Sequence, residues 1–280
     1  MAHLTDKAAR YHSKTKTSAE IIALLTDFGS RDQYVAAMKG VILSINPAAQ
    51  IVDITHEVQP QRTRQAGYLL WSVYKYFPSG SIFINVVDPE VGSKRRIIGV
   101  RTSHFTFLAP DNDLLDFIFS EEKVIEEIEI IEEKAKKYML GEISSTFHGR
   151  DVFAPLAAHL SQGFPLKRLG IPLKPKSVSS QFIYLEEDTT KCCILHIDRF
   201  GNVITNLKMN KTEQVVEKLK AVSIGTTLVS RLINCYDEAP ANTPCLIVGS
   251  NGLIEISVKN RSAAHLLNAT LDTPVKIYWR

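Results

Sequence analysis

The stretch "IIALLTDFGSRDQYVAAMKGVILSINPAAQIVDIT", residues 21 to 55, decides the fold class of this chain. It opens with a short apolar run, continues with apolar residues at helical spacing from Tyr34 to Ile42, and closes with a second apolar run. Short apolar strands joined by an amphipathic helix are typical of a parallel sheet that is covered on both faces. The stretch therefore predicts the start of an α/β domain.

The same alternation continues along the first half of the chain. Residues 61–77 ("QRTRQAGYLLWSVYKYF") predict a helix, and residues 81–88 ("SIFINVVD") predict a third strand. Residues 96–110 add two strands that could form a hairpin, and the charged residues 117–140 are expected to be partly helical. "GRDVFAPLAAHLSQG" predicts a helix that Asp151 could cap. We expect a mostly parallel sheet with helices on both faces.

The texture of the sequence changes after Gly170. Residues 171–180 carry prolines, serines and lysines without a period, and short β-like runs such as "CCILHID" and "LIEISV" follow. We expect four parts: a mobile extension (1–20), an α/β domain (21–170), a linker (171–180) and a small antiparallel β-barrel domain (181–280), with a sandwich as the alternative to the barrel.

The composition favours an ordinary cytoplasmic protein. The chain has 280 residues, 45% of them hydrophobic and 22% charged, and its net charge is only +3. This charge gives no case for a nucleic-acid partner, and no apolar run reaches the about 20 residues that a membrane span needs. The first twenty residues lack the apolar core of a secretory signal. The four cysteines have no metal-site spacing, which predicts buried reduced thiols.

Polar residues at the carboxyl ends of the predicted strands mark the candidate ligand site, because ligands bind there in open parallel sheets. Each of these residues, taken alone, is also a common turn former. Four such places are Asp27, Asp53 to His56, Asp88 and residues 198–206 ("DRFGNVITN"). A fifth place, residues 146–151 ("TFHGRD"), precedes a predicted helix and offers a histidine beside backbone N–H groups.

Several catalytic motifs are missing. Asp27-Phe28-Gly29 has the letters of the metal-binding triplet of protein kinases, but no glycine-rich loop, strand lysine or upstream catalytic loop accompanies it. The chain also lacks the glycine-rich dinucleotide and phosphate loops and the serine-hydrolase elbow.

Seven segments in order make the chain resemble the S-adenosyl-L-methionine (SAM) hydroxide adenosyltransferase family, which is related to the fluorinase and chlorinase enzymes. The segments are "TDFGSRDQYVAAMKG", "VDITHEV", "VVDPEVGSKRR", "FLAPDNDLL", "TFHGRDVFAP", "DRFGNVITN" and "GSNGLIEISVKNRSAAHLL". The resemblance implies an α/β domain followed by a β-barrel domain, in a homotrimer with active sites between subunits. It also implies hydrolysis of SAM at ribose C5′ to adenosine and L-methionine, without a cofactor or a metal.

The resemblance assigns a catalytic set of Asp88, Arg95 and His148 that activates water. Methionine leaves as a neutral thioether, so the difficulty of this reaction lies in positioning and deprotonating the nucleophile. Any of the three residues could contribute to the base, and the sequence leaves that choice open. The resemblance also implies a substrate-binding set in which Asp27 accepts both ribose hydroxyls, Asp198 pairs with the methionine ammonium group and Asn202 bonds the adenine edge. The full set is Asp27, Asp32, Asp198, Phe200, Asn202, Ser250 and Asn260.

Three residues depart from the family pattern. Glu90 replaces an expected glycine in the turn after Asp88, which would strain the turn if residue 90 has a positive φ. Gln61 replaces a common aromatic wall of the pocket, and Asn251 differs from the halogenases.

Two other functions remain as alternatives. A halogenase would use a halide on the same substrate, but a bare halide needs no proton removed, and the halogenases carry a serine where this chain has Gly149. A non-catalytic sensor of adenosine or SAM could use the same binding residues without turnover.

Overall fold

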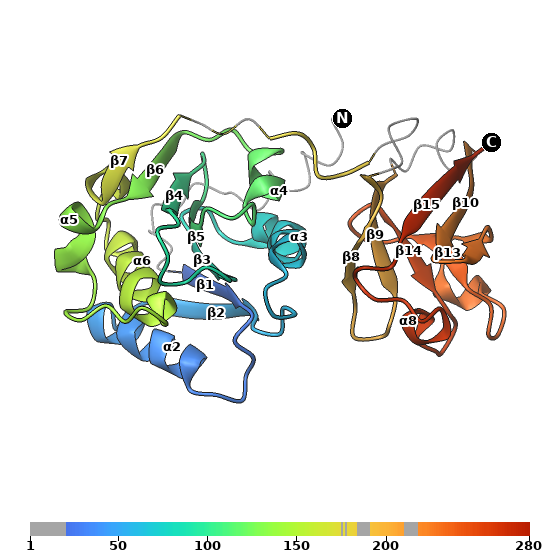
Figure 1. Cartoon of the computed structure of the whole chain (residues 1–280), viewed down its shortest axis with the longest axis horizontal. Helices are drawn as coiled ribbons and strands as arrows, with labels where there is room; N and C mark the ends of the chain where they lie inside the picture. The colour runs from blue at the N-terminus through green and yellow to red at the C-terminus, as the bar shows by residue number, and fades with distance from the viewer. Residues whose placement is uncertain (1–20, 175, 177, 184–190, 210–217) are drawn as a thin grey trace. The chain divides into compact units, whose positions relative to one another are not determined.

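The computed structural model describes residues 21–174, 176, 178–183, 191–209 and 218–280. The predicted mobile extension at residues 1–20 lies outside the described residues. The chain divides into two compact units, residues 1–179 and residues 180–280 (Figure 1). We call them the sheet unit and the C-terminal unit.

One seven-stranded sheet organises the sheet unit, in the order β2-β1-β3-β5-β4-β6-β7. Its strands are β1 (Ile21–Thr26), β2 (Gln50–Thr55), β3 (Ile82–Val86), β4 (Ile97–Arg101), β5 (Thr106–Pro110), β6 (Glu126–Ile130) and β7 (Gly170–Pro172). The pairs among β2, β1, β3 and β5 are parallel, whereas β4, β6 and β7 join through antiparallel pairs. The sheet is thus mixed, with a parallel half that matches the expectation. The expected hairpin is the β4–β5 pair.

Both faces of this sheet are buried, as the alternation of β3 shows. Ile82, Ile84 and Val86 belong to a core cluster that also contains residues of α2 and α6. Phe83 points to the other face, where its ring stacks on Phe107 with centroids 5.0 Å apart. Because successive side chains of a strand point to opposite faces, one apolar strand can supply both layers.

The helices form around these two faces. On one face α2 (Tyr34–Ile45) packs against α6 (Ala154–Ser161), and on the other α3 (Thr63–Val73) packs against α4 (Asp116–Phe119) (Figure 1). The remaining turns are η1 (Tyr74–Tyr76), α5 (Glu132–Ala135), η2 (Lys136–Tyr138), the π-helical η3 (Gly149–Phe153) and η4 (Leu166–Arg168).

One local expectation was confirmed and one was wrong. The charged segment 117–140 is partly helical, as expected, in α4, α5 and η2, and it also contains the strand β6, whose Ile128 and Ile130 are buried while Glu129 alternates with them. Asp151 does not cap a helix: it lies inside the π-helical turn, fully buried, and its carboxylate accepts hydrogen bonds from the Ser144 amide and the Arg150 side chain.

The C-terminal unit consists of two sheets over one core. A three-stranded sheet has the order β11-β10-β15 and a five-stranded sheet the order β12-β13-β14-β9-β8; all pairs are antiparallel except β12–β13. The elements are β8 (Ile194–Ile197), β9 (Val203–Lys208), β10 (Leu219–Ile224), β11 (Thr227–Val229), β12 (Leu232–Ile233), η6 (Tyr236–Glu238), β13 (Cys245–Val248), β14 (Leu253–Ser257), α8 (Ala263–Leu266) and β15 (Val275–Trp279). The described strands form no closed barrel, so the expected barrel stays a prediction.

The cysteines only partly meet the expectation of buried thiols. None of the four, all within the described residues, forms a disulfide; Cys192 and Cys245 are buried, but Cys193 is half-buried and Cys235 is exposed.

Strand register brings two of the predicted site residues together. Thr26 at the end of β1 pairs with Val86 at the end of β3. Asp27 and Asp88 follow these two strands, so they emerge at the same carboxyl edge of the sheet.

Candidate active site

Asp88, Arg95 and His148 form one connected cluster in the sheet unit, in which His148 is half-buried. The Arg95 guanidinium donates to both carboxylate oxygens of Asp88, with its Nε 2.8 and 2.7 Å from them. The Arg95 Nη2 also contacts Asp88 and lies 2.9 Å from His148 Nδ1. The Arg95 and Asp88 side chains are only 5% and 4% exposed. The structure therefore brings together all three residues of the predicted catalytic set.

The contact with Arg95 assigns the proton on His148. A guanidinium can only donate, so His148 Nδ1 must accept, and the imidazole proton sits on Nε2. Burial and the positive charge of Arg95 lower the pKa of His148 below its ordinary value, against the opposing charges of Asp88 and Asp151. His148 is thus a neutral ring whose Nε2 is a hydrogen-bond donor.

The turn that carries Asp88 needs a glycine at position 92, not at 90. Gly92 has a φ of +80°, and a Cβ there would lie 2.2 Å from the Ser145 carbonyl oxygen. Glu90 is not among the residues with positive φ, and its carbonyl accepts from the Ser93 amide in an ordinary turn. The replacement of the expected glycine by Glu90 therefore leaves this turn unstrained.

A π-helical turn and three aromatic rings hold His148 beside the Asp27 loop. His148 directly precedes η3, and single π-turns inside helices often occur at functional sites. Phe147 packs against Phe28 and Tyr34 with ring centroids 5.8 and 5.1 Å apart. A Cβ at Gly149 would approach Phe28 to 3.1 Å and Met38 to 3.2 Å, so the absence of a side chain at Gly149 allows this close packing.

Asp27 lies close to this cluster. Its carboxylate accepts a 2.9 Å hydrogen bond from the Gln61 amide. Burial and the negative charge of Asp88 raise the pKa of Asp27, while backbone hydrogen bonds partly oppose the shift. Gln61 itself has a φ of +67°, an uncommon conformation for a residue with a side chain. The departure at Gln61 thus coincides with a strained backbone that holds Asp27.

The remaining predicted residue of the sheet unit lies apart from this network. Asp32 is exposed, just before α2. Its position favours solvent contact over a buried role.

In the C-terminal unit Asp198, Phe200 and Asn202 share one tight loop. Asp198 accepts from the Phe200 and Asn202 amides at 2.9 and 2.8 Å, and from the Asn202 side chain at 2.8 Å. Asn202 is buried, whereas Phe200 is 78% exposed. The loop presents a carboxylate, an amide and a free aromatic ring at one place.

One further segment packs against this loop. A Cβ at Gly201 would lie 2.1 Å from Ser262 Oγ, so the loop packs against the segment after Asn260. Asn260 and Ser250 are both exposed, in the turns that follow β14 and β13.

Sequence reasoning missed Tyr236 and Glu255. The Tyr236 hydroxyl lies 3.3 Å from a Glu255 carboxylate oxygen. Burial and the charge of Asp198 raise the pKa of Glu255, despite the hydrogen bond from Tyr236. The one signal in the sequence was a glutamate inside the apolar run "LIEIS".

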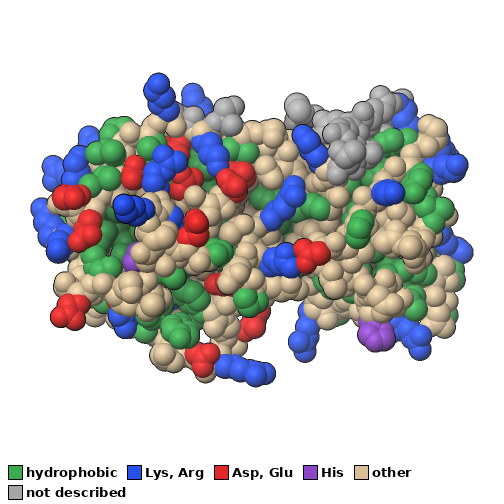
Figure 2. Space-filling view, viewed as in Figure 1, with side chains coloured by type: hydrophobic (Ala, Val, Ile, Leu, Met, Phe, Trp, Pro, Cys, Tyr) green, Lys and Arg blue, Asp and Glu red, His purple; other side chains and the backbone are tan. Residues whose placement is uncertain are grey.

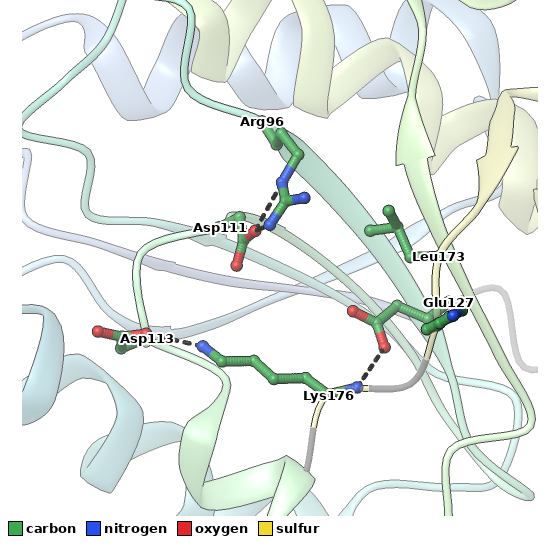
Figure 3. Close-up of a pocket in the computed structure, with 7 residues that line it drawn as sticks. Arg96, Asp111, Asp113, Glu127, Leu173 and Lys176 are labelled. Carbon is green, nitrogen blue, oxygen red and sulfur yellow. Dashed lines mark hydrogen bonds and ion pairs between the residues drawn. The ribbon is translucent and has the colours of Figure 1, made fainter. Parts of the chain in front are cut away.

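A pocket of 420 Å³ lies elsewhere on the sheet unit (Figure 3). Its charged residues largely pair with each other: Arg96 bonds Asp111, and Lys176 bonds Asp113. None of the predicted site residues lines it. On the face seen in Figure 2, basic and acidic side chains of the sheet unit are interspersed in the same way.

The described residues contain no cluster of His, Cys, Asp and Glu that could hold a metal ion. Within the same residues, no helix is both long and apolar enough to span a membrane.

Comparisons with known proteins complete this picture. Residues 22–170 match the model of the SAM hydroxide adenosyltransferase N-terminal domain, and residues 192–276 that of its C-terminal domain. The chain is 35% identical to the (R)-S-adenosyl-L-methionine hydrolase of Methanocaldococcus jannaschii, over 93% of this chain and 96% of that protein. A fluorinase from an Actinoplanes species is 28% identical over 69% of this chain and 74% of its own length.

A solved structure agrees with the sequence comparison. The crystal structure of an uncharacterized conserved protein from Thermotoga maritima matches with a TM-score of 0.80 and 32% identity, covering 91% of this chain and 99% of that one.

Proposed function

Because this chain belongs to the SAM hydroxide adenosyltransferase family, we propose that it is an enzyme that hydrolyses SAM to adenosine and L-methionine. The observation that carries the proposal is the contact of the buried Arg95 side chain with both Asp88 and His148. A protein that only bound the nucleoside would have no use for such a cluster.

The reaction is a displacement at ribose C5′. The oxygen of water attacks C5′ as the bond from C5′ to sulfur breaks, and methionine departs as a neutral thioether. The attacking water loses one proton, which the protein must accept. Holding the water in line with the breaking bond supplies much of the rate enhancement.

The hydrogen-bond pattern favours Asp88 as the proton acceptor. His148 Nδ1 is occupied by Arg95 and its Nε2 already carries a proton, so the ring can donate to the water but not accept from it. Asp88 keeps lone pairs beyond those used by Arg95, and the guanidinium charge stabilises the developing hydroxide. We assign orientation of the water to His148 and deprotonation to Asp88.

The binding roles follow the same chemistry. Asp27 has two acceptor oxygens that suit the vicinal ribose hydroxyls, and one of them also accepts from Gln61. Asp198 would pair with the methionine ammonium group, Asn202 with the adenine edge, and the exposed ring of Phe200 would form an apolar wall. Asp32, Ser250 and Asn260 complete the proposed set as outer contacts of the methionine part.

Hydrolysis is favoured over halogenation by Gly149. A serine there would need room that Phe28 and Met38 already occupy. The higher identity to the hydrolase than to the fluorinase points the same way. The name of that hydrolase specifies the R form, and we extend this preference for the R configuration at sulfur to the present chain.

The larger assembly remains part of the proposal. The resemblance supports a homotrimer with active sites between subunits, barrel closure of the C-terminal unit, a cytoplasmic location and the absence of a cofactor. Sedimentation of the purified chain would test the trimer directly.

Turnover in oxygen-18 water tests the function. Purified protein is incubated with each sulfonium epimer of SAM, with and without chloride, and products are measured by mass spectrometry. We expect 5′-labelled adenosine and an equal amount of methionine, and loss of both in Asp88→Ala. Formation of 5′-chloroadenosine would indicate a halogenase, and binding without products would indicate a sensor.

A further inference from the structure

His56 lies in a hydrogen-bonded chain next to the proposed substrate site, although the proposed function gives it no role. Thr26, fully buried at the end of β1, places its hydroxyl 2.9 Å from His56 Nδ1. On the other side of the ring, His56 Nε2 lies 3.0 Å from Asp53 Oδ1, at an angle that misses good hydrogen-bond alignment. Lys39 donates to the other oxygen of Asp53 at 2.6 Å.

Asp53 is the common acceptor of the polar contacts from Lys39 and His56. Lys39 can only donate and an ionised Asp53 can only accept, so the His56 proton belongs on Nε2 and Nδ1 is the acceptor. Burial would raise the pKa of Asp53, but the interactions with Lys39 and His56 outweigh burial and lower that pKa, which keeps Asp53 ionised. Thr26 therefore donates to His56, and its oxygen stays free to accept from the Phe28 amide at 3.2 Å.

His56 also bonds the other end of the loop formed by residues 26–29. Its carbonyl oxygen accepts a 2.7 Å hydrogen bond from the Gly29 amide. Gly29 has a φ of +68°, so the loop turns sharply there. His56 thus contacts the loop on both sides of Asp27. Its ring contacts the Thr26 hydroxyl, and its main-chain carbonyl accepts from the Gly29 amide.

We propose that His56 is a positioning residue that sets the Asp27 carboxylate for the ribose diol. This role rests on the proposed function, because it requires Asp27 to bind the two ribose hydroxyls. A carboxylate that accepts two hydroxyls must hold both oxygens at hydrogen-bond distance, so a small shift of the loop weakens both contacts. His56 acts on the substrate only through the loop.

The alternative is a histidine that merely fills the core. Loss of such a residue would lower stability and weaken all ligands alike. Loss of a positioning residue would instead reduce the preference for nucleosides that carry the diol. Comparing adenosine with 2′,3′-dideoxyadenosine separates the two cases, because only adenosine can use Asp27.

Two substitutions of His56 keep different parts of the ring. His56→Asn retains an acceptor near the position of Nδ1, whereas His56→Gln retains a polar group near Nε2 and removes the acceptor for Thr26. Thr26→Val removes the hydroxyl with little change in volume. Asp53→Asn alters a side chain that is 40% exposed and is the variant least disruptive to folding.

The test is calorimetric binding of both nucleosides to the full-length chain, with thermal unfolding recorded for every variant. We expect the wild type to prefer adenosine, and His56→Gln and Thr26→Val to lose about tenfold of that preference, as removal of a hydrogen bond to a charged group would. His56→Asn should keep most of it, and Asp53→Asn should lose about threefold. The exposed His104 supplies a matched control, since His104→Asn should leave the ratio unchanged.

The outcomes separate the two proposals. A wild type that prefers adenosine, with both His56→Gln and Thr26→Val retaining the full preference, would overturn the role of His56 alone. If these two variants fail to fold, an unchanged ratio in Asp53→Asn would overturn it. A wild type that binds neither nucleoside would overturn the proposed function and the role of His56 together.

Discussion

The buried pair of Asp88 and Arg95 allows a quantitative prediction that separates stability from catalysis. Their side chains are 4% and 5% exposed, and three hydrogen bonds join them. Removing one partner of such a pair leaves an uncompensated buried charge, which costs about 3–5 kcal/mol. Arg95→Met and Asp88→Leu should each lower the free energy of unfolding by about that amount, a large share of the roughly 5–15 kcal/mol typical of a domain.

The double variant Asp88→Leu/Arg95→Met should recover most of this loss. Replacing a whole buried ion pair by apolar residues of similar volume is often close to neutral, so we expect a double variant within about 2 kcal/mol of the wild type. The coupling free energy between the two substitutions would then be at least about 4 kcal/mol. Activity should be absent from all three variants, because the stable double variant lacks both the proton acceptor and the guanidinium charge.

Guanidinium denaturation followed by circular dichroism supplies the stabilities, and chromatography of adenosine supplies the activities. The neighbouring pair of Arg96 and Asp111 is the matched control, since Arg96 is 52% exposed and Arg96→Met should cost under about 1 kcal/mol without loss of activity. Single costs that simply add, with coupling under about 0.5 kcal/mol, would refute mutual compensation of the buried charges. An active double variant would refute the assignment of water activation to this pair.

Three further predictions concern pH and two residues beside the site. The pKa of His148 is lowered, so the neutral ring persists as pH falls below the ordinary value of 6.5. We therefore expect kcat/KM to stay level through pH 6.5. A decline of kcat/KM centred at or above pH 6.5 in the wild type, and absent from His148→Gln, would contradict this prediction. Protonating His148 also costs the folded state more than the unfolded one, so its contribution to stability is complete above pH 6.5 and is lost as pH falls toward the lowered pKa. Gly149→Ser should lower the free energy of unfolding by about 1–3 kcal/mol, because the new side chain would crowd Phe28 and Met38. The variant should form no 5′-chloroadenosine when chloride is present. An unchanged free energy of unfolding would show that the site has room for a side chain. Gln61→Gly keeps the backbone amide that donates to Asp27 and tolerates the positive φ, so KM should change less than about twofold. Valine is β-branched and disfavours a positive φ, so Gln61→Val should raise KM about tenfold. Equal KM values for the two variants would argue against a role of Gln61 in holding Asp27.

The sequence predicted the parallel half of the sheet because strands and their ends depend on local patterns. Apolar runs ending in Asp27 and Asp88 indicate strand ends, and parallel strands place such ends at one edge. The grouping of Arg95 and His148 with Asp88 came from the family resemblance, since residues 53 positions apart carry no local sign of contact.

Other features depended on long-range contacts. Residues 126–130 belong to a charged segment that was expected to be partly helical, and pairing with β4 makes these five residues a strand with alternating burial. The position of Asp151 before an apolar run predicted a helix cap, but in the folded unit its carboxylate accepts a hydrogen bond from the Ser144 amide. Glu255 and Tyr236 meet only because β14 and the turn of η6 lie side by side in the folded unit.

The charges of the sheet unit favour the substrate of this reaction over its product. Asp27 and Asp88 are both carboxylates at one sheet edge. Burial raises the pKa of Asp27, and the negative charge of Asp88 adds to that shift. Arg95 offsets Asp88, and His148 is neutral, so the four residues carry one net negative charge when Asp27 is ionised. A sulfonium brings the positive charge that this arrangement lacks, and the attraction grows as water is excluded. Adenosine has lost that charge, so the same field that draws SAM in gives no reason for adenosine to stay. The Asp27 carboxylate leaves the proposed site with a net negative charge. It therefore also helps distinguish a charged substrate from its neutral product.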